Sequence, residues 1–317
     1  MATPPIFSII IPARDEEEAI PHCLNSLFSL TFPIDKYEVI LIDNGSTDDT
    51  VDIAKKYPNL KILYKPNCNV GAVRNFGAKN SLGHYLVFID ADCVIHKDWL
   101  SNSYDLVSNE PETVFGGGAM LPFRPKWIEK YWLLGSEKNS ILPSKLIGAS
   151  IVIPRNVFFN VGGFDELLTS GEDSLLHENL NSKKYTIKIT NKIDVIHLGN
   201  AKTVKEFIKR QVWHSENYAS RISQSIKDPI FLLASLFMIT GSALLINLLT
   251  LGLKTPSTIT LMTLFLAAPM ALSIKRIKRS NSKLKNIKNL PAIYLIDIIY
   301  LTGRSWGILK GLFNKLI

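Results

Sequence analysis

Two aspartates stand one residue apart directly after an apolar run. The run covers residues 86–89 (LVFI) and leads into Asp90 and Asp92. Side chains at positions i and i+2 leave an extended chain on the same side, so the two carboxylates are expected to face the same space. Such a pair suits Mg²⁺ or Mn²⁺, which take hard oxygen ligands together with substrate phosphates. The alternative is a loop with solvated acids.

Acidic residues follow two other apolar runs in the same way. In VILIDNGSTDDT, Asp43 and Asn44 end the run and Gly45 permits a tight turn. Helix capping accounts for the Ser, Thr and Asp residues that follow, but not for Asp43, which we expect to bind a base or a ribose. In SIIIPARDEEEAI, Glu16 either belongs to an acidic first helical turn or contacts the edge of a nucleotide.

Four more residues offer chemistry. Glu172 and Asp173 follow Gly171 at an expected helix start, where acids are favoured by the helix dipole and where one could also be a general base. His197 ends the run DVIH and is either an ordinary core or loop histidine or a third metal ligand. Arg74 could pair with a phosphate or with an acid such as Asp90.

The elements that must position these residues alternate along 1–200. Short apolar strands are predicted at 6–11, 38–43, 60–64, 85–90, 113–117, 148–153 and 185–189. Helices are predicted near 16–29, 48–57, 71–81 and 97–108. This order predicts an α/β fold with a mostly parallel sheet and helices on both faces. Ligands bind such sheets at the carboxyl ends of their strands, where Asp43 and Asp90 are expected.

Charge divides the chain into two regions. The 317 residues carry 36 Lys and Arg against 28 Asp and Glu, but residues 229–317 hold eleven of these bases and a single acid, Asp297. The C-terminal region is therefore at about +10 and residues 1–228 at about −2, which argues against a nucleic-acid surface on the front part. Three cysteines without metal-binding spacing (Cys23, Cys68 and Cys93) indicate a reduced, cytosolic setting. The short run 6–11, with no basic residues before it, does not predict a signal peptide.

The C-terminal region, 229–317, has the composition of a membrane domain. Residues 230–253 and 256–274 are uncharged, and the first stretch reaches about 36 Å as a helix, enough to cross a bilayer. A loop at 275–289 with seven Lys and Arg follows. Basic loops stay in the cytoplasm, so we expect a hairpin with the domain 1–228 on the cytoplasmic side. Two buried core helices are the alternative.

Two other segments border this hairpin. Residues 203–226 are amphipathic, with aromatic and basic side chains mixed, and predict either a surface helix or a helix lying on the membrane. Residues 290–317 predict an interfacial helix or a third span. Gly303, Gly307 and Gly311 give this tail a small-xxx-small spacing that lets helices approach closely, which indicates self-association in the membrane.

The ordered set of motifs resembles a known family. IPARDEE, IDNGSTDDT, NVGAVRNFGAKNSLGHYLVFIDADC, GGFDE and GED are similar to glycosyltransferase family 2, whose members are inverting enzymes with the GT-A fold. The resemblance covers roughly 6–215, and two C-terminal spans are typical of bacterial members that build cell-surface glycans. It implies an enzyme in the bacterial inner membrane, multi-pass, with a cytoplasmic catalytic domain. The donor would be a nucleotide sugar, by family habit a UDP-sugar, and the acceptor a lipid-linked or cell-surface glycan.

The resemblance also implies a role for each matching residue. Asp90 would face the ribose or the metal, and Asp92 would coordinate Mn²⁺ or Mg²⁺, joined by His197. Asp173 would be the catalytic base, with Glu172 as the alternative. The nucleotide sugar would be held by Pro12, Ala13, Arg14, Glu16, Asp43, Asn44, Arg74, Asp90, Arg210 and Gln211.

Two departures from the family pattern matter. Asp15 stands where an Asn is usual, and QVWHS at 211–215 lacks the Arg-Trp of the QxxRW motif found in processive members. The second departure argues against a polymerising synthase and favours transfer of one sugar. A nucleotidyltransferase and a non-catalytic membrane scaffold remain as alternatives. The first should carry a Gly-rich basic loop after the first strand, and the second should have damaged acid pairs.

Overall fold

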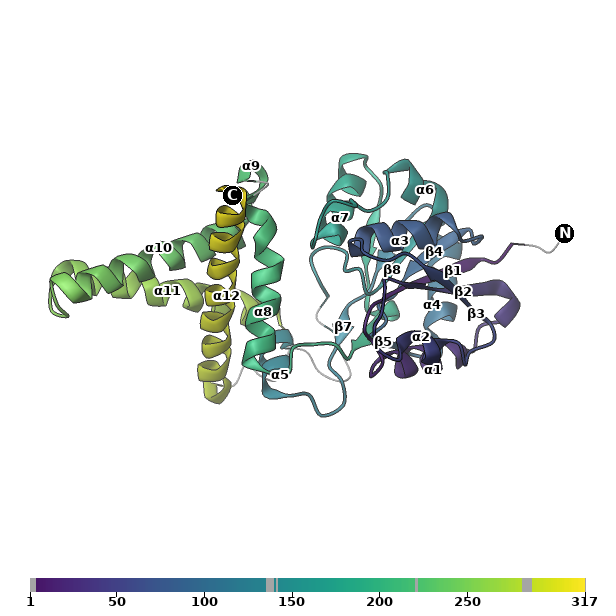
Figure 1. Cartoon of the computed structure of the whole chain (residues 1–317), viewed down its shortest axis with the longest axis horizontal. Coiled ribbons are helices and arrows are strands. Elements are labelled where there is room, and N and C mark those ends of the chain that lie inside the picture. The colour runs from purple at the N-terminus through teal and green to yellow at the C-terminus, as the bar shows by residue number, and fades with distance from the viewer. Residues whose placement is uncertain (1–3, 135–139, 141, 220–221, 281–286, 317) are drawn as a thin grey trace. The chain divides into compact units, whose positions relative to one another are not determined.

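The computed structural model describes residues 4–134, 140, 142–219, 222–280 and 287–316. The chain forms two compact units, one made of 1–123 and 136–199 and the other of 124–135 and 200–317 (Figure 1). The amphipathic segment that the sequence grouped with the catalytic domain thus belongs to the second unit. The middle of the expected basic loop, at 281–286, lies outside the described residues.

The first unit is built on a seven-stranded sheet with the order β3-β2-β1-β4-β8-β6-β9. Its strands are β1 (Phe7–Ala13), β2 (Tyr37–Asp43), β3 (Leu60–Tyr64), β4 (Tyr85–Phe88), β6 (Val114–Gly116), β8 (Ile151–Pro154) and β9 (Ile187–Ile189). All neighbours are parallel except β8, which runs antiparallel to both β4 and β6. The predicted mostly parallel sheet is confirmed, with β8 as its one reversed strand.

Helices cover both faces of this sheet, as β1 illustrates. Successive side chains of a strand point to opposite faces: Ile9 and Ile11 belong to one buried cluster and Ile10 to the other. The first cluster includes residues of α1 (Ile20–Phe28) and α4 (Trp99–Asn109). The second includes residues of α3 (Val70–Lys79), α6 (Arg155–Asn160) and α7 (Glu172–Ser182). The short helix α2 (Thr50–Ala54) follows β2.

A second, three-stranded sheet was not predicted. It has the order β5-β10-β7, with β5 (Cys93–Ile95), β10 (Val195–His197) and β7 (Ala119–Met120). β5 and β10 are antiparallel, and Cys93 lies opposite His197 in their register. Strands of two or three residues are too short to give a period-2 pattern, which is why the sequence indicated only that His197 ends a strand.

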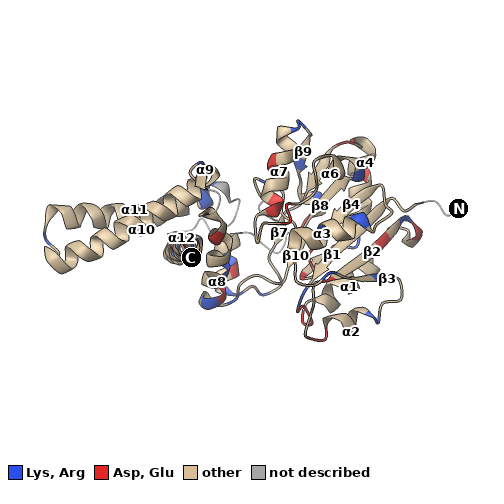
Figure 2. Cartoon of the chain, turned by 45° about the horizontal axis from the view of Figure 1, so that its top comes forward, with Lys and Arg blue, Asp and Glu red and all other residues tan. Residues whose placement is uncertain are grey.

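The second unit consists of helices: α5 (Trp127–Leu133), α8 (Val204–Ser215), α9 (Ile222–Ser225), α10 (Pro229–Thr250), α11 (Pro256–Arg279) and α12 (Leu290–Leu316). Asp228 and Thr255 cap α10 and α11, each followed by a Pro in the first turn, the arrangement that favours helix starts. Three of these helices are long and apolar enough to cross a membrane, over Pro229–Thr250, Pro256–Lys278 and Leu290–Asn314. Figure 2 shows that the α10–α11 hairpin is almost free of charged residues between its ends.

The glycine stripe of α12 faces α8. A side-chain carbon added at Gly303 would meet Gln211, one at Gly307 would meet Ser215, and one at Gly311 would meet Glu216 just beyond α8. In Figure 1, α12 runs beside α8, and both cross the α10–α11 hairpin steeply. The close approach that small residues permit is therefore used within the chain. Self-association through the stripe stays a prediction.

A buried ion pair joins α11, α12 and α5 in the same unit. Asp297, which is fully buried, accepts hydrogen bonds from Arg276 and from Ser273, whose Oγ lies 2.6 Å away. Arg276 also donates to the backbone carbonyls of Tyr131 and Trp132, and its guanidinium lies 4.5 Å from the centre of the Trp132 ring. The one acid of the C-terminal region is thus a structural cross-link.

Candidate active site

The loops after β1 and β2 are tied to each other by side chains. Asp15 Oδ1 accepts hydrogen bonds from the backbone N and the hydroxyl of Thr47, at 2.7 and 3.1 Å. Glu17 accepts from the backbone N of Asp49, and the backbone N of Glu16 donates to Thr50 Oγ1 at 2.7 Å. Asp15 has φ +54°, a conformation that Asn and Asp adopt most readily after Gly. An Asn would serve the same turn, so Asp15 in place of the usual Asn is accounted for.

Asp43 is buried at the end of β2 and has partners of its own. Its carboxylate accepts from the backbone N of Gly45 and of Ser46, both at 3.1 Å. Gly45 has φ +82°, which this turn requires. The sequence left Asp43 unexplained except by a nucleotide, and the turn is a second explanation. Asn44, next in the chain, exchanges hydrogen bonds with the backbone of Cys68.

Pro12 and Ala13 are the last residues of β1, and Ala13 lies opposite Asp43 in the parallel register. Arg14 follows and is exposed. Six of the predicted nucleotide-sugar-binding residues therefore gather at the carboxyl ends of β1 and β2, namely Pro12, Ala13, Arg14, Glu16, Asp43 and Asn44. This is the edge of an α/β sheet where ligands bind.

Arg74 connects two of the predicted acids, one of which, Glu172, lies 98 residues further along the sequence. Its guanidinium is buried on α3 and donates to Asp90 Oδ1 and to Glu172 Oε1, both at 2.6 Å. Burial by itself would lower the pKa of Arg74, but the two carboxylates hold it above its ordinary value. Of the two pairings expected for Arg74, the structure shows the one with acids. Glu172 is thereby engaged in a buried ion pair.

The neighbouring Asp173 has a different environment. It is the second residue of α7, and its two oxygens accept from the backbone N of Gly148 at 3.1 Å and of Ser174 at 2.6 Å. Burial and then the negative charge of Glu172 raise the pKa of Asp173 to about 6, against the opposing effect of Arg74. A carboxylate with that pKa is ionised near neutral pH and is still a competent proton acceptor.

The predicted geometry of Asp90 and Asp92 is wrong in one respect. β4 ends at Phe88, and the chain turns before Cys93, whose backbone N donates to the carbonyl of Asp90. The two aspartates are therefore not successive positions on one face of a strand. The turn separates them, so that Asp90 pairs with Arg74 and Asp92 faces β10.

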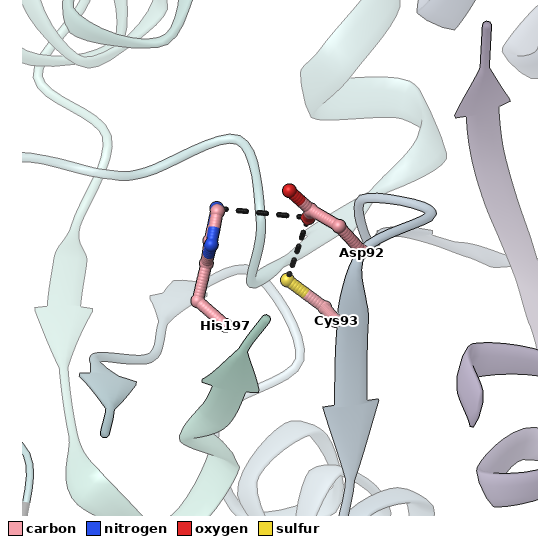
Figure 3. Close-up of side chains that lie close together, drawn as sticks. All are labelled: Asp92, Cys93 and His197. Carbon is pink, nitrogen blue, oxygen red and sulfur yellow. Dashed lines mark hydrogen bonds and ion pairs between the residues drawn. The ribbon is translucent and has the colours of Figure 1, made fainter. Parts of the chain in front are cut away.

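Asp92 meets His197 and Cys93 at the small sheet. His197 Nε2 lies 3.6 Å from Asp92 Oδ1, and Cys93 Sγ donates to the same oxygen at 3.5 Å. Figure 3 shows these side chains pointing toward one another. The ligand atoms all lie within 4.8 Å of one another. A carboxylate and an imidazole at this spacing fit a divalent cation, and Asp92 and His197 are the residues that would hold it.

Several residues that the sequence analysis did not single out support this site. Asn75, next to Arg74 on α3, donates to the carbonyl of Phe164 and accepts from its backbone N, which fixes the GGFDE segment. A side chain at Gly163 would collide with Asn75, and one at Gly199 with the carboxylate of Asp92. The glycines of GGFDE and HLG were the sequence signal that could have indicated these contacts, since glycine often marks a close approach of the backbone to another group.

Arg210 and Gln211 lie on α8 in the second unit, where Gln211 is buried against α12. Their role in holding the nucleotide sugar stays a prediction.

Comparisons with known proteins identify the family to which this chain belongs. The family described as Glycosyl transferase family 2 matches residues 8–168, and this chain belongs to that family. It is 33% identical over 220 residues to glycosyltransferase AglE of Haloferax volcanii, covering 66% of this chain and 72% of that one. It is 27% identical over 197 residues to the poly(ribitol-phosphate) beta-N-acetylglucosaminyltransferase TarS of Staphylococcus aureus, covering 57% of this chain but only 34% of TarS.

Solved structures confirm the GT-A fold. The mannosyltransferase PcManGT of Pyrobaculum calidifontis, in complex with GDP-Man and Mn²⁺, superposes with a TM-score of 0.62 at 17% identity, over 99% of this chain and 88% of that one. TarS residues 1–349 superpose with a TM-score of 0.50 at 20% identity, over 94% and 90%. The family match and the relatives named as glycosyltransferases confirm the predicted class of enzyme, in place of a nucleotidyltransferase or a non-catalytic scaffold.

Proposed function

We propose that this protein is a membrane-associated, inverting glycosyltransferase that moves one sugar from a nucleotide-diphosphate sugar to a hydroxyl of a lipid-linked or cell-surface glycan. Asp173 is the general base. The observation that carries the proposal is that the two adjacent acids have different partners. Arg74 pairs with Glu172, whereas Asp173 accepts hydrogen bonds from the backbone N–H groups of Gly148 and Ser174.

The reaction requires a base that can take a proton from an acceptor hydroxyl at neutral pH. A pKa of about 6 leaves Asp173 about nine-tenths ionised at pH 7. The hydroxyl, once its proton moves to Asp173, attacks the anomeric carbon from the face opposite the diphosphate. A single displacement inverts the configuration and needs no covalent intermediate on the enzyme.

Other residues of the site bind and orient the donor. The cross-linked loops after β1 and β2, with Pro12, Ala13, Arg14, Glu16 and the turn at Asp43–Asn44, form the proposed base and ribose site. Asp92 and His197 would hold a divalent cation, Mn²⁺ or Mg²⁺ by the family's habit, which supplies neutralisation of the diphosphate leaving group. UDP is the proposed nucleotide.

The second unit supports a membrane location for the acceptor. We propose that the α10–α11 hairpin crosses the bacterial inner membrane and that the catalytic domain is cytoplasmic, because seven Lys and Arg lie within 275–288, at the C-terminal end of α11 and after it. α12 lies beside the polar helix α8 and crosses the hairpin steeply. A helix paired with α8, which carries Lys205, Lys209 and Arg210, fits the membrane interface better than the hydrocarbon core.

The first test is donor hydrolysis and sugar transfer by the purified full-length protein. A panel of UDP- and GDP-sugars is offered with and without Mn²⁺, and lipid extracts serve as acceptors. Metal-dependent turnover of one donor supports the proposal. Absence of turnover with every donor would overturn it.

The second test replaces Asp173 by Asn, which has nearly the same size and keeps one oxygen to accept from one of the two N–H groups of Gly148 and Ser174, but cannot take the proton. We expect a loss of transfer of about 10²–10⁴-fold with unchanged donor affinity. The matched control is Glu178→Gln on the same helix, an exposed acid paired with Lys145. Full activity in Asp173→Asn would move the base to another residue.

A further inference from the structure

Cys93 is placed beside the predicted cation site by the register of two strands. It lies directly opposite His197 in the antiparallel pair β5–β10. Directly opposite residues of such a pair project their side chains to the same face, with Cβ atoms about 4.5–5.5 Å apart. Asp92 reaches that face because it belongs to the turn before β5. The trio therefore comes from two segments more than a hundred residues apart in the sequence.

The two distances from Asp92 to the other members of the trio match those of a tetrahedral site. Bonds of about 2.3 Å to sulfur and about 2.0–2.2 Å to nitrogen and oxygen place neighbouring ligand atoms about 3.3–3.6 Å apart. Asp92 Oδ1 lies 3.5 Å from Cys93 Sγ and 3.6 Å from His197 Nε2. The side chains of Asp92 and His197 are 12% and 17% exposed, and Cys93 is fully buried.

The carboxylate of Asp92 is held in place by its surroundings. The chain at Gly199 passes so close behind it that a side chain there would collide with Oδ2. The backbone N of Leu198 donates to the carbonyl of Asp92 at 2.8 Å. Asp90, two residues before Asp92, forms its ion pair with Arg74 instead. The donor set on this face is therefore one oxygen, one nitrogen and one sulfur.

We propose that Cys93 is a third protein ligand of the cation and that the site consequently selects a borderline ion such as Zn²⁺ or Co²⁺ over Mg²⁺. Thiolate and imidazole ligands favour Zn²⁺ and Co²⁺, whereas Mg²⁺ favours oxygen alone in octahedral geometry. Binding replaces the thiol hydrogen of Cys93 by the metal, and the proton leaves to solvent. Three protein ligands leave a fourth position for a diphosphate oxygen. The inference concerns the cation of the proposed function but does not rest on catalysis.

The experiment is a Co²⁺ titration of the full-length protein in detergent, followed by absorption. A thiolate bound to Co²⁺ gives a near-ultraviolet charge-transfer band, and tetrahedral geometry gives intense visible bands. We expect both, at one Co²⁺ per chain. One equivalent of Zn²⁺ should remove the bands and a large excess of Mg²⁺ should not.

The other two cysteines are the controls. Cys23 is also buried, with its Sγ 3.7 Å from the carbonyl of Asp90, and Cys68 is partly buried. Cys23→Ser and Cys68→Ser should keep the charge-transfer band, and Cys93→Ser should lose it together with more than about tenfold in Co²⁺ affinity, since even outer-shell changes cost 10–100-fold. The double variant Cys23→Ser/Cys68→Ser retains Cys93 as its single thiol, so its band assigns the ligand without disturbing the site.

Two results would overturn the inference: a wild-type protein saturated with Co²⁺ that shows no thiolate band, or a band that survives in Cys93→Ser. Its failure is separable from that of the proposed function. A thiolate band without turnover of any donor leaves the ligand assignment standing and removes the transferase proposal. Metal-dependent turnover without the thiolate band supports the transferase proposal and removes the assignment of Cys93 as a ligand.

Discussion

Replacing Glu172 by Gln should move the acid limb of the pH–rate profile to lower pH. After burial, the charge of Glu172 is the main influence that raises the pKa of Asp173, and Arg74 acts in the opposite direction. The substitution removes the negative neighbour and also leaves the positive charge of Arg74 balanced by Asp90 alone. Both changes favour the ionised form of Asp173, so its pKa should fall.

The size of the effect follows from the ionised fraction. With a pKa of about 6, Asp173 is about one-tenth ionised at pH 5, whereas an aspartate at the ordinary 3.8 is about nine-tenths ionised. The rate at pH 5, relative to the plateau, should therefore be about a tenth in the wild type. It should rise severalfold in Glu172→Gln, up to a limit of about ninefold. The plateau itself should fall, because Arg74 loses one of its two anchors.

The assay is single-sugar transfer between about pH 4.5 and 8.5 at saturating donor. Each pH is repeated at several metal concentrations, so that loss of the cation from Asp92 and His197 is separated from protonation of the base. Glu178→Gln, on the exposed side of the same helix, is the control and should reproduce the wild-type limb. A wild-type rate at pH 5 equal to the plateau would refute the assignment. An acid limb that stays at the same pH in Glu172→Gln would also refute the assignment.

Two further substitutions probe the second unit. Asp297→Ala leaves Arg276 without its buried carboxylate and should lower the free energy of unfolding by about 3–5 kcal/mol, measured by thermal unfolding in detergent; an unchanged melting temperature would contradict the structural role of the pair. Gly307→Leu forces a side chain into the contact with Ser215 and should cost about 1–3 kcal/mol and expose α8 to protease. Thr302→Leu, on the exposed side of α12, is its control, and equal cleavage of both variants would show that α8 does not pack on the stripe.

The sequence predicted the first unit well where its signals are local. Apolar runs of four to seven residues ended by Asp43 or by Asp90 are enough to indicate buried strands and the edge at which their acids gather. The reversed direction of β8 and the small sheet could not be predicted. Strand direction depends on the path of the connection, and strands of two or three residues carry no periodicity.

The sequence by itself determined the family, the α/β architecture, the apolar hairpin and the candidate acids, because each depends on residue types at short spacing. Tertiary structure decided what the acids do. It paired Arg74 with Glu172 across 98 residues, left Asp173 with backbone donors and a raised pKa, and brought Cys93 opposite His197. It also turned the glycine stripe of α12 toward α8. The physical reason is common to all four: protonation, ligation and close approach depend on which distant side chains share a buried space, and residue spacing carries no record of that.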